Sequence, residues 1–191
     1  MYSAAILAGG RASRFGGRDK SALVVEGRTI RDRQIDVLSQ VAGEVLIIGA
    51  DQDIVAGSGP MGGVHAALTR ARGDAVLVLA CDMPFVTADF AAFLLGLAGD
   101  ADVVIPRTAS GYHPLCSVYT RACLEPLADR LAARSLKMHG LLDNLRVRGD
   151  VRVRVVEGDE IDRFGDRDRL LANVNTPADY AGLEPLHGHK R

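Results

Sequence analysis

The sequence predicts a fold of the three-layer α/β/α class, in which a mostly parallel sheet lies between two layers of helices. Short apolar runs alternate with segments of helical periodicity over residues 4–105, and this order builds a parallel sheet covered on both faces. The runs are almost wholly apolar, as in strands that are buried on both sides. With 191 residues, of which 48% are apolar and 25% charged, the chain can bury a core, and we expect one domain over residues 1–186.

The first half of the chain supplies most of the predicted elements. The predicted strands are 4–8, 45–48, 76–81 and 103–105, and the predicted helices are 29–42, 62–72 and 87–98. Within the first helix, apolar residues and Gln34 recur three and four positions apart, which places them on one face. Thr87 is a suitable N-cap for the third helix, because its hydroxyl can accept a hydrogen bond from a backbone N–H group of the first turn.

The last third of the chain is less regular. Residues 115–119 are a predicted strand and 120–133 a predicted helix. Residues 151–156 alternate valine with Arg152 and Arg154, which indicates a strand half exposed to water near the edge of the sheet. Thr176 followed by proline predicts the start of a helix that runs to residue 183. The tail, residues 187–191, is predicted to be disordered.

Composition excludes several classes of protein. No run approaches the roughly 20 apolar residues of a membrane helix, and the first strand begins without a charged leader, so we expect a cytoplasmic protein and no membrane partner. Three cysteines without CxxC spacing favour small core residues over a disulfide framework or a zinc site. The net charge of −1 predicts no nucleic-acid partner.

The charge is distributed unevenly along the chain. Residues 11–33 hold seven basic and three acidic side chains, a net charge of +4 that leaves −5 for the remainder. A small basic zone beside glycines suits a compact anion such as a nucleotide phosphate.

The loop after the first strand is the most informative segment. Residues 7–20, LAGGRASRFGGRDK, contain four glycines and four basic residues. Glycines let the main chain approach a phosphate with its N–H groups, and Arg14 and Lys20 can neutralise the charge. The segment is not a Walker P-loop, because Asp19 rather than glycine precedes Lys20. It therefore predicts phosphate binding, with a mobile surface loop as the alternative.

A second glycine-rich segment favours a competing hypothesis. Residues 57–62 formally match GxGxxG, and Asp82 follows twenty residues after Gly62, where a dinucleotide-binding fold places its ribose carboxylate. That pattern would indicate an NAD-linked oxidoreductase. Against it, the fingerprint belongs after the first strand, and Pro60 is unusual within it.

Asp82 and two asparagines complete the candidate site. Asp82 ends a predicted buried strand, where a carboxylate beside a phosphate loop is well placed to bind Mg²⁺; a turn or cap role before Pro84 is the alternative. Asn173 and Asn175 alternate with a valine, so both side chains point to one side and can share a face with a ligand, although turn formation alone would also explain them. His113, before a proline, receives no catalytic role.

Together these segments resemble the NTP-transferase family, and within it the molybdenum cofactor guanylyltransferases. The resemblance rests on motifs in the family's order along nearly the whole chain. They are Leu7-Ala8-Gly9-Gly10, Arg14, Gly16-Gly17, Asp19-Lys20, Gly59-Pro60-Met61-Gly62-Gly63, Cys81-Asp82-Met83-Pro84-Phe85, His113-Pro114-Leu115 and Asn173-Val174-Asn175-Thr176-Pro177. The chain is shorter than usual for the family between residues 48 and 59, which bears on base recognition.

The resemblance implies a Rossmann-like nucleotidyltransferase fold, and it implies roles for residues of the motifs. Nucleotide binding is expected of Leu7, Ala8, Gly9, Gly10, Gly17, Lys20, Asp53, Gly59, Gly63 and Asp82. Lys20, Arg14 and Asp82 are expected to be catalytic, and Asp82 is expected to hold Mg²⁺. Asn173 and Asn175 fall on positions linked to the second substrate or another function.

The implied reaction is attack by the terminal phosphate of molybdenum-molybdopterin on the α-phosphorus of GTP, with release of pyrophosphate. GTP and molybdopterin are therefore the expected partners, with transient contacts to other proteins that make or accept the cofactor. A cytidylyltransferase or another nucleotidyltransferase, the oxidoreductase, and a non-catalytic nucleotide-binding protein remain alternatives at this point.

Overall fold

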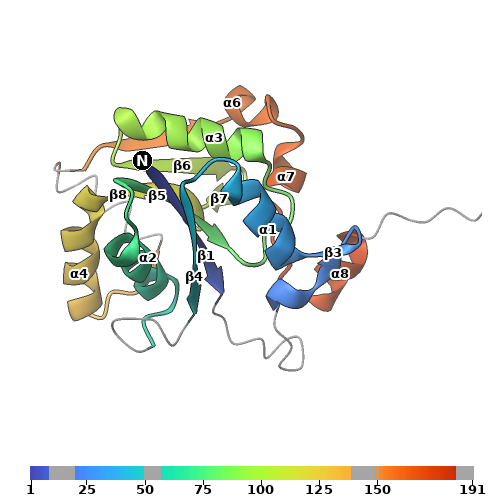
Figure 1. The fold of residues 1–191 in the computed structure, drawn as a ribbon, viewed down its shortest axis with the longest axis horizontal. Helices are drawn as coiled ribbons and strands as arrows, with labels where there is room; N and C mark the ends of the chain where they lie inside the picture. The colour runs from blue at the N-terminus through green and yellow to red at the C-terminus, as the bar shows by residue number, and fades with distance from the viewer. Residues whose placement is uncertain (9–19, 50–56, 139–148, 150, 184–191) are drawn as a thin grey trace, which may run out of the picture.

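A mixed seven-stranded sheet forms the centre of the molecule (Figure 1). The structure is a computed structural model that describes residues 1–8, 20–49, 57–138, 149 and 151–183. The sheet strands are β1 (Tyr2–Ala8), β4 (Glu44–Gly49), β5 (Ala75–Ala80), β6 (Val103–Thr108), β7 (Gly111–Tyr112), β8 (Cys116–Thr120) and β9 (Val153–Glu157). A separate hairpin pairs β2 (Val24–Val25) with β3 (Arg28–Thr29).

The helices connect these strands. They are α1 (Ile30–Ser39), α2 (Gly59–Arg70), α3 (Ala88–Gly96), α4 (Leu124–Ala132), α6 (Asp159–Asp162), α7 (Arg167–Leu170) and α8 (Pro177–Leu183). Three short 3-10 turns accompany them: η2 (Lys20–Ala22), η4 (Leu97–Gly99) and η5 (Arg121–Cys123). The longest helix in the described part of the chain has 12 residues, and none there is long and apolar enough to cross a bilayer.

Strand order confirms the predicted α/β class and refines the expected direction of the strands. The order is β4-β1-β5-β8-β6-β7, with β9 paired to β6. Strands β4, β1, β5, β6 and β9 are parallel, whereas β8 lies antiparallel between β5 and β6, and β7 is antiparallel to β6. The reversal arises because only residues 109–115 separate β6 from β8, too few for the helical crossover that a parallel pair requires.

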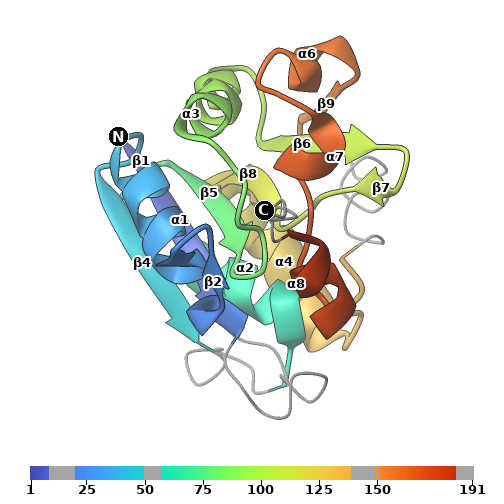
Figure 2. The same ribbon diagram turned by 90° about the vertical axis from the view of Figure 1, so that its right-hand side faces the viewer.

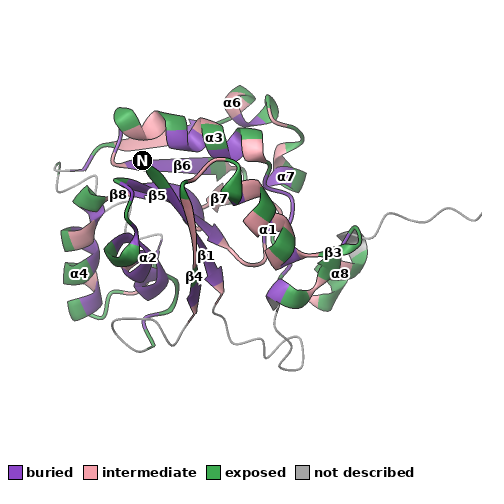
Figure 3. Ribbon diagram, in the orientation of Figure 1, coloured by how far each residue is buried: buried purple, intermediate pink, exposed green. Residues whose placement is uncertain are grey.

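Alternate residues of the central strands enter two separate cores. Ala5 and Leu7 of β1 pack with residues of α2 and α4, while Ala4 and Ile6 pack with residues of α1 and α3. Figure 1 shows these helix pairs on opposite faces of the sheet, and Figure 3 shows the central strands buried. The three layers predicted from the apolar runs therefore follow from strands that are buried on both faces.

Local cap and edge predictions are confirmed. The Thr87 hydroxyl accepts a hydrogen bond from Phe90 N at 3.3 Å, and Thr176 accepts one from Asp179 N at 3.1 Å at the start of α8. Strand β9 pairs only with β6 among the described residues, as its alternating charges suggested. The expected disordered tail lies outside the described residues.

The cysteine prediction is confirmed for two of the three residues. Cys116 and Cys123 are buried, and burial raises the pKa of each thiol to about 12. Cys81 is half-buried at the end of β5.

A small third hydrophobic cluster connects the β2–β3 hairpin to the C-terminal segment. Val25 of β2, Ile30 of α1, Phe85 and Val174 are buried together, with Tyr180 of α8 packed against them. The Tyr180 hydroxyl also donates to the Val24 carbonyl at 2.6 Å. Figure 1 shows α8 beside the β2–β3 hairpin, and Figure 2 shows β2 and α8 at the same height.

Candidate functional site

The parallel strands end at one edge of the sheet, and the predicted site residues follow those ends. Strand β1 ends at Ala8, β4 at Gly49 and β5 at Ala80. Asp82 lies two residues beyond β5, within a turn closed by a hydrogen bond from Met83 N to the Ala80 carbonyl at 3.3 Å. The Asp82 side chain is half-buried, and its Oδ1 atom is shielded from solvent. In open α/β sheets this edge is where ligands bind.

Main-chain bonds attach the Asp82 turn, residues 80–83, to strands on both sides. Cys81 N donates to the Leu7 carbonyl of β1 at 3.3 Å, and Ala80 N donates to the Leu115 carbonyl at 2.8 Å. The turn therefore lies between the end of β1, from which the glycine-rich loop departs, and the His-Pro-Leu segment before β8.

The C-terminal segment reaches the same turn. Val174 N donates to the Asp82 carbonyl at 2.8 Å, and the Val174 side chain is fully buried in the third cluster. Asn173 and Asn175 are exposed on either side of it. This alternation agrees with the expectation that the two asparagines share one face, and the main chain between them is bonded to the Asp82 carbonyl.

Helix α1 donates side-chain hydrogen bonds to the Asp82 turn and to Pro84, from residues that the sequence analysis did not identify as functional. Gln34 Nε2 donates to the carbonyls of Ala80 at 2.7 Å and Met83 at 3.0 Å. Arg33 Nε donates to the Pro84 carbonyl at 3.3 Å. One feature of the sequence could have identified Gln34: its amide side chain lies on the core-facing side of a predicted helix, where apolar residues are usual.

The second glycine-rich segment forms the N-terminus of α2. Gly59 has a φ of +58°, a conformation that favours glycine, and Pro60 lies at the start of the helix. A Cβ on Gly63 would lie 3.1 Å from Leu7 Cδ1, so Gly63 lets the helix pack closely on the end of β1. The predicted roles of Gly59 and Gly63 in nucleotide binding stay predictions.

Several predicted residues are not described. Gly9, Gly10, Arg14, Gly17 and Asp53 lie outside the described residues. Lys20 opens η2, which packs beside α1, and only its main chain is described. Leu7 is buried and Ala8 half-buried at the end of β1.

The donor chemistry of the described residues fits a cation that is shared with a substrate. They include no group of three or more His, Cys, Asp or Glu side chains able to enclose a metal ion. Asp82 offers a hard carboxylate oxygen at the sheet edge, and Mg²⁺ usually binds one or two carboxylates together with substrate phosphates and water. The Asp82 carboxylate thus fits Mg²⁺ bound together with a nucleotide.

His113 is held in the loop before β8. Its Nε2 lies 2.9 Å from Thr108 Oγ1, and its carbonyl accepts from Ser117 Oγ at 2.7 Å. Burial lowers the pKa of His113 below its usual value, so the imidazole is neutral at neutral pH. The contacts make His113 part of the loop's hydrogen-bonded framework.

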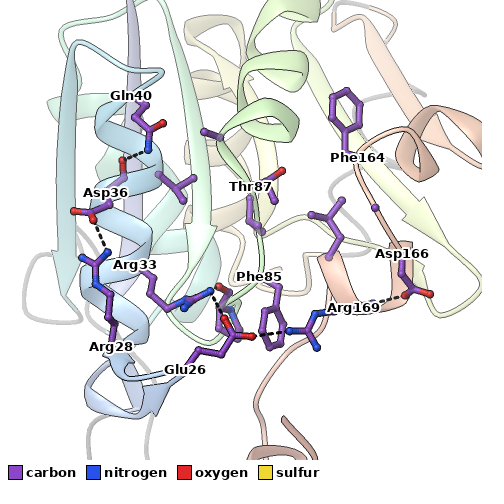
Figure 4. A pocket seen from close by; sticks show the side chains of 16 residues that line it. Glu26, Arg28, Arg33, Asp36, Gln40, Phe85, Thr87, Phe164, Asp166 and Arg169 are labelled. Atoms are coloured by element: carbon purple, nitrogen blue, oxygen red, sulfur yellow. Dashed lines mark hydrogen bonds and ion pairs between the residues drawn. The ribbon is translucent and has the colours of Figure 1, made fainter. Parts of the chain in front are cut away.

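A cavity of about 630 Å³ lies on the α1 and α3 side, lined in part by residues 84–88, which follow the Asp82 turn (Figure 4). None of the predicted site residues lines it; its walls include Arg33, Phe85 and Arg169. Glu26 forms ion pairs with Arg33 at 3.0 Å and Arg169 at 2.8 Å, and the Arg169 guanidinium lies 4.1 Å from the centroid of the Phe85 ring. The charged side chains of Glu26, Arg33 and Arg169 thus form ion pairs with one another in the cavity wall.

Two cations of the basic zone are paired with carboxylates in the structure. Arg28 pairs with Asp36 at 2.6 Å, and Arg33 pairs with Glu26. Two of the seven basic residues in 11–33 therefore have their charge offset by nearby carboxylates, one of them from outside that segment. The phosphate-binding prediction then rests on the earlier cations, Arg14 and Lys20 among them.

Comparison with known proteins identifies relatives along most of the chain. The family model of the MobA-like NTP transferase domain matches residues 4–148. A probable molybdenum cofactor guanylyltransferase of Pelotomaculum thermopropionicum is 34% identical over 186 residues, covering 91% of this chain and 87% of the relative.

Solved structures share the fold. Molybdopterin-guanine dinucleotide biosynthesis protein A of Archaeoglobus fulgidus matches with a TM-score of 0.78 and 22% identity, covering 95% of this chain and 96% of that one. Rv0371C of Mycobacterium tuberculosis, solved as a complex with manganese, matches with a TM-score of 0.61 and 17% identity, covering 95% and 97%.

Proposed function

The chain belongs to the MobA-like NTP transferase family, and from this premise we propose that it transfers GMP from GTP to the terminal phosphate of molybdenum-molybdopterin, releasing pyrophosphate. A relative that covers most of the chain carries the name of this activity. The match to this relative favours guanine over cytosine as the base, and a nucleotidyltransferase over an oxidoreductase. The position of the GxGxxG segment also argues against the oxidoreductase, because the segment follows β4 and not the first strand.

One structural observation carries the proposal: segments distant in the sequence converge on the turn that bears Asp82. Main-chain bonds join this turn to Leu7, Leu115 and Val174. We infer that the carboxylate lies beside the end of β1, where the predicted phosphate loop begins, and close to Asn173 and Asn175. A site for two anionic substrates needs these features together.

The acceptor needs no general base in this mechanism. A phosphate monoester has a second pKa near about 6, so it is largely ionised at neutral pH. The site must instead align the two phosphates and reduce their mutual repulsion. Lys20, Arg14 and the main-chain N–H groups of Gly9 and Gly10 are proposed to bind the GTP phosphates.

Asp82 is proposed to hold Mg²⁺ together with the nucleotide. When bound, the ion would neutralise charge that develops on the phosphates. Asn173 and Asn175 are proposed to position the second substrate from the opposite side of the turn. The roles of Leu7, Ala8, Gly17, Asp53, Gly59 and Gly63 in nucleotide binding, and a cytoplasmic location with other cofactor-synthesis proteins as partners, remain parts of the proposal.

A panel of nucleotides tests the proposal. The melting temperature of the full chain is measured with GTP, CTP, ATP and NADH, each with and without Mg²⁺, because a ligand that binds the native state raises it. GTP with Mg²⁺ is expected to give the largest increase, and added molybdenum-molybdopterin is expected to give pyrophosphate release. A larger increase with CTP would favour the cytidylyltransferase, an increase with NADH alone would favour the oxidoreductase, and GTP binding without pyrophosphate release would leave a non-catalytic binding protein.

A further inference from the structure

We propose that Gln34, a buried residue of α1, is a positioning residue that fixes the Asp82 turn and thereby sets how tightly the site binds a divalent cation with GTP. The inference rests on the proposed function and adds a residue to it that neither the motifs nor the comparisons point to. Gln34 is separated from the site by the turn itself and acts through that turn.

Gln34 bonds to both ends of the Asp82 turn. Its Nε2 atom donates to the carbonyls of Ala80 at 2.7 Å and Met83 at 3.0 Å, the first and fourth residues of the turn. A primary amide has two N–H groups on one nitrogen and can make both bonds at once. Asp82 lies between the two carbonyls, so the direction of its carboxylate depends on how these ends are held.

Burial prevents water from replacing the bond to Met83, whereas the bond to Ala80 is part-buried. Gln34 and Met83 are each 2% exposed. The Ala80 carbonyl keeps its bond from Met83 N, whereas the buried Met83 carbonyl loses the donor of Gln34 and must move toward another partner or remain unpaired, which alters the turn. Removal of the amide therefore changes the geometry at Asp82 even where the rest of the fold stays in place.

The glutamine is not explained by stability alone. Gln34 Oε1 is buried, and within the described ranges it has no hydrogen-bond partner. An unpaired buried acceptor opposes folding and offsets the gain from the two donated bonds. Such a residue on the core-facing stripe of a helix is better explained by the geometry that it imposes on the turn.

Helix α1 gives Gln34 a rigid support. Ile30 and Leu38, one turn before and one turn after Gln34 on the same face, are fully buried. The N-terminus is capped by Thr29, whose hydroxyl accepts from Asp32 N at 3.0 Å. A supporting residue on a packed and capped helix holds a site group more accurately than one on a loop.

The contacts that remain without Gln34 predict a variant that folds. Arg33 still binds the Pro84 carbonyl, and Val174 N still binds the Asp82 carbonyl. Methionine is close to glutamine in length and shape but has no N–H donor. Gln34→Met therefore removes the two bonds with little change in volume.

The experiment compares Gln34→Met with Gln40→Met. Gln40 lies at the exposed end of the same helix, and its side-chain amide donates to the Asp36 carbonyl, four residues earlier. Mn²⁺ binding to the full chain in the presence of GTP is measured by the electron paramagnetic resonance signal of free Mn²⁺, with the melting temperature recorded in parallel. Gln34→Met is expected to weaken Mn²⁺ binding about tenfold or more, as loss of outer-sphere support does at metal sites, whereas Gln40→Met leaves it unchanged.

A purely structural role would lower the melting temperature and leave Mn²⁺ binding to the folded protein unchanged. We expect the reverse, with the melting temperature of Gln34→Met within about 5 °C of the wild type and the Mg²⁺ concentration for half-maximal turnover raised in step with Mn²⁺ dissociation. If Gln34→Met does not fold, Gln34→Asn takes its place, because its amide is one methylene too short to bridge both carbonyls.

The outcomes separate this inference from the proposed function. Mn²⁺ binding equal to that of the wild type in Gln34→Met, or in its asparagine replacement, overturns the role of Gln34 while leaving Asp82 in place. Wild-type Mn²⁺ binding in Asp82→Ala overturns the metal site itself and this inference with it. Loss of binding in both Asp82→Ala and Gln34→Met, with Gln40→Met unaffected, supports it.

Discussion

Replacement of Asp82 by alanine should abolish Mg²⁺-dependent transfer while the fold survives. The bonds that attach the turn use main-chain atoms: the carbonyls of Ala80, Asp82 and Met83 and the N–H groups of Ala80 and Cys81. Alanine keeps all of these atoms. The substitution therefore removes the carboxylate and keeps these main-chain bonds, so a change in activity at an unchanged melting temperature reports on the carboxylate.

The size of the effect follows from how few carboxylates the described site contains. Asp82 is the carboxylate proposed to hold the ion, and the described residues provide no cluster of further ligands to replace it. Loss of one preorganised electrostatic contact commonly costs about 10²–10³ in rate. Without its protein ligand the ion also binds more weakly, so we expect at least a 1000-fold loss, equivalent to about 4 kcal/mol of transition-state stabilisation.

Pyrophosphate release at increasing Mg²⁺ concentration measures the loss, with GTP and molybdenum-molybdopterin as substrates. The matched control is Asp89→Ala, which removes an exposed carboxylate from the first turn of α3. Asp89→Ala should retain wild-type kinetics, and both variants should melt near the wild-type temperature. Turnover of Asp82→Ala close to that of the wild type would refute the assignment of Asp82 to the metal.

Three further predictions address phosphate binding, packing and pH. Lys20→Ala should lower the single-turnover rate roughly 100-fold, or about 2.7 kcal/mol, and a change below tenfold would make Lys20 peripheral. Val174→Ala should lower the free energy of unfolding by about 1–3 kcal/mol in urea titrations, because it empties part of the third cluster; an unchanged midpoint would contradict that packing. Glu44 has its pKa lowered to about 2, chiefly by hydrogen bonds from Ser3 Oγ and Arg72 N. Because the native state favours the ionised carboxylate, Glu44 stabilises the fold above its ordinary pKa of 4.5, and this stabilisation is lost as the pH falls toward 2. The difference in melting temperature between wild type and Glu44→Gln should therefore shrink over that interval. A constant difference would contradict this role of Glu44.

Much of the secondary structure could be predicted because it depends on neighbouring residues. The buried runs at residues 4–8 and 76–81 and the caps at Thr87 and Thr176 have local signatures, and the structure contains each of them with boundaries shifted by a few residues. The helix predicted from residue 62 begins three residues earlier, at Gly59, because the positive φ of this glycine is compatible with the helix entry.

The pairing and direction of strands distant in the sequence could not be predicted as well. Strand β8 is almost as buried as its neighbour β5, and nothing in residues 116–120 distinguishes an antiparallel strand from a parallel one. Its direction follows from the short connection after β6, where Gly111 with a φ of +112° reverses the chain. The β2–β3 hairpin was also missed, because its strands have two residues each and give no period.

The antiparallel strand has a consequence for the site. Because β8 runs against β5, its first residues lie at the same edge as the last residues of β5, and the Leu115 carbonyl accepts the bond from Ala80 N. A parallel strand in this place would bring its far end to that edge and leave Ala80 N to another partner. The turn bearing Asp82 is thus supported on one side by a parallel neighbour, β1, and on the other by the loop that enters an antiparallel one. The described segments at Leu7, Leu115 and Val174 therefore meet at the Asp82 turn, because the reversal after β6 brings the His-Pro-Leu segment back to the edge where β1 and β5 end.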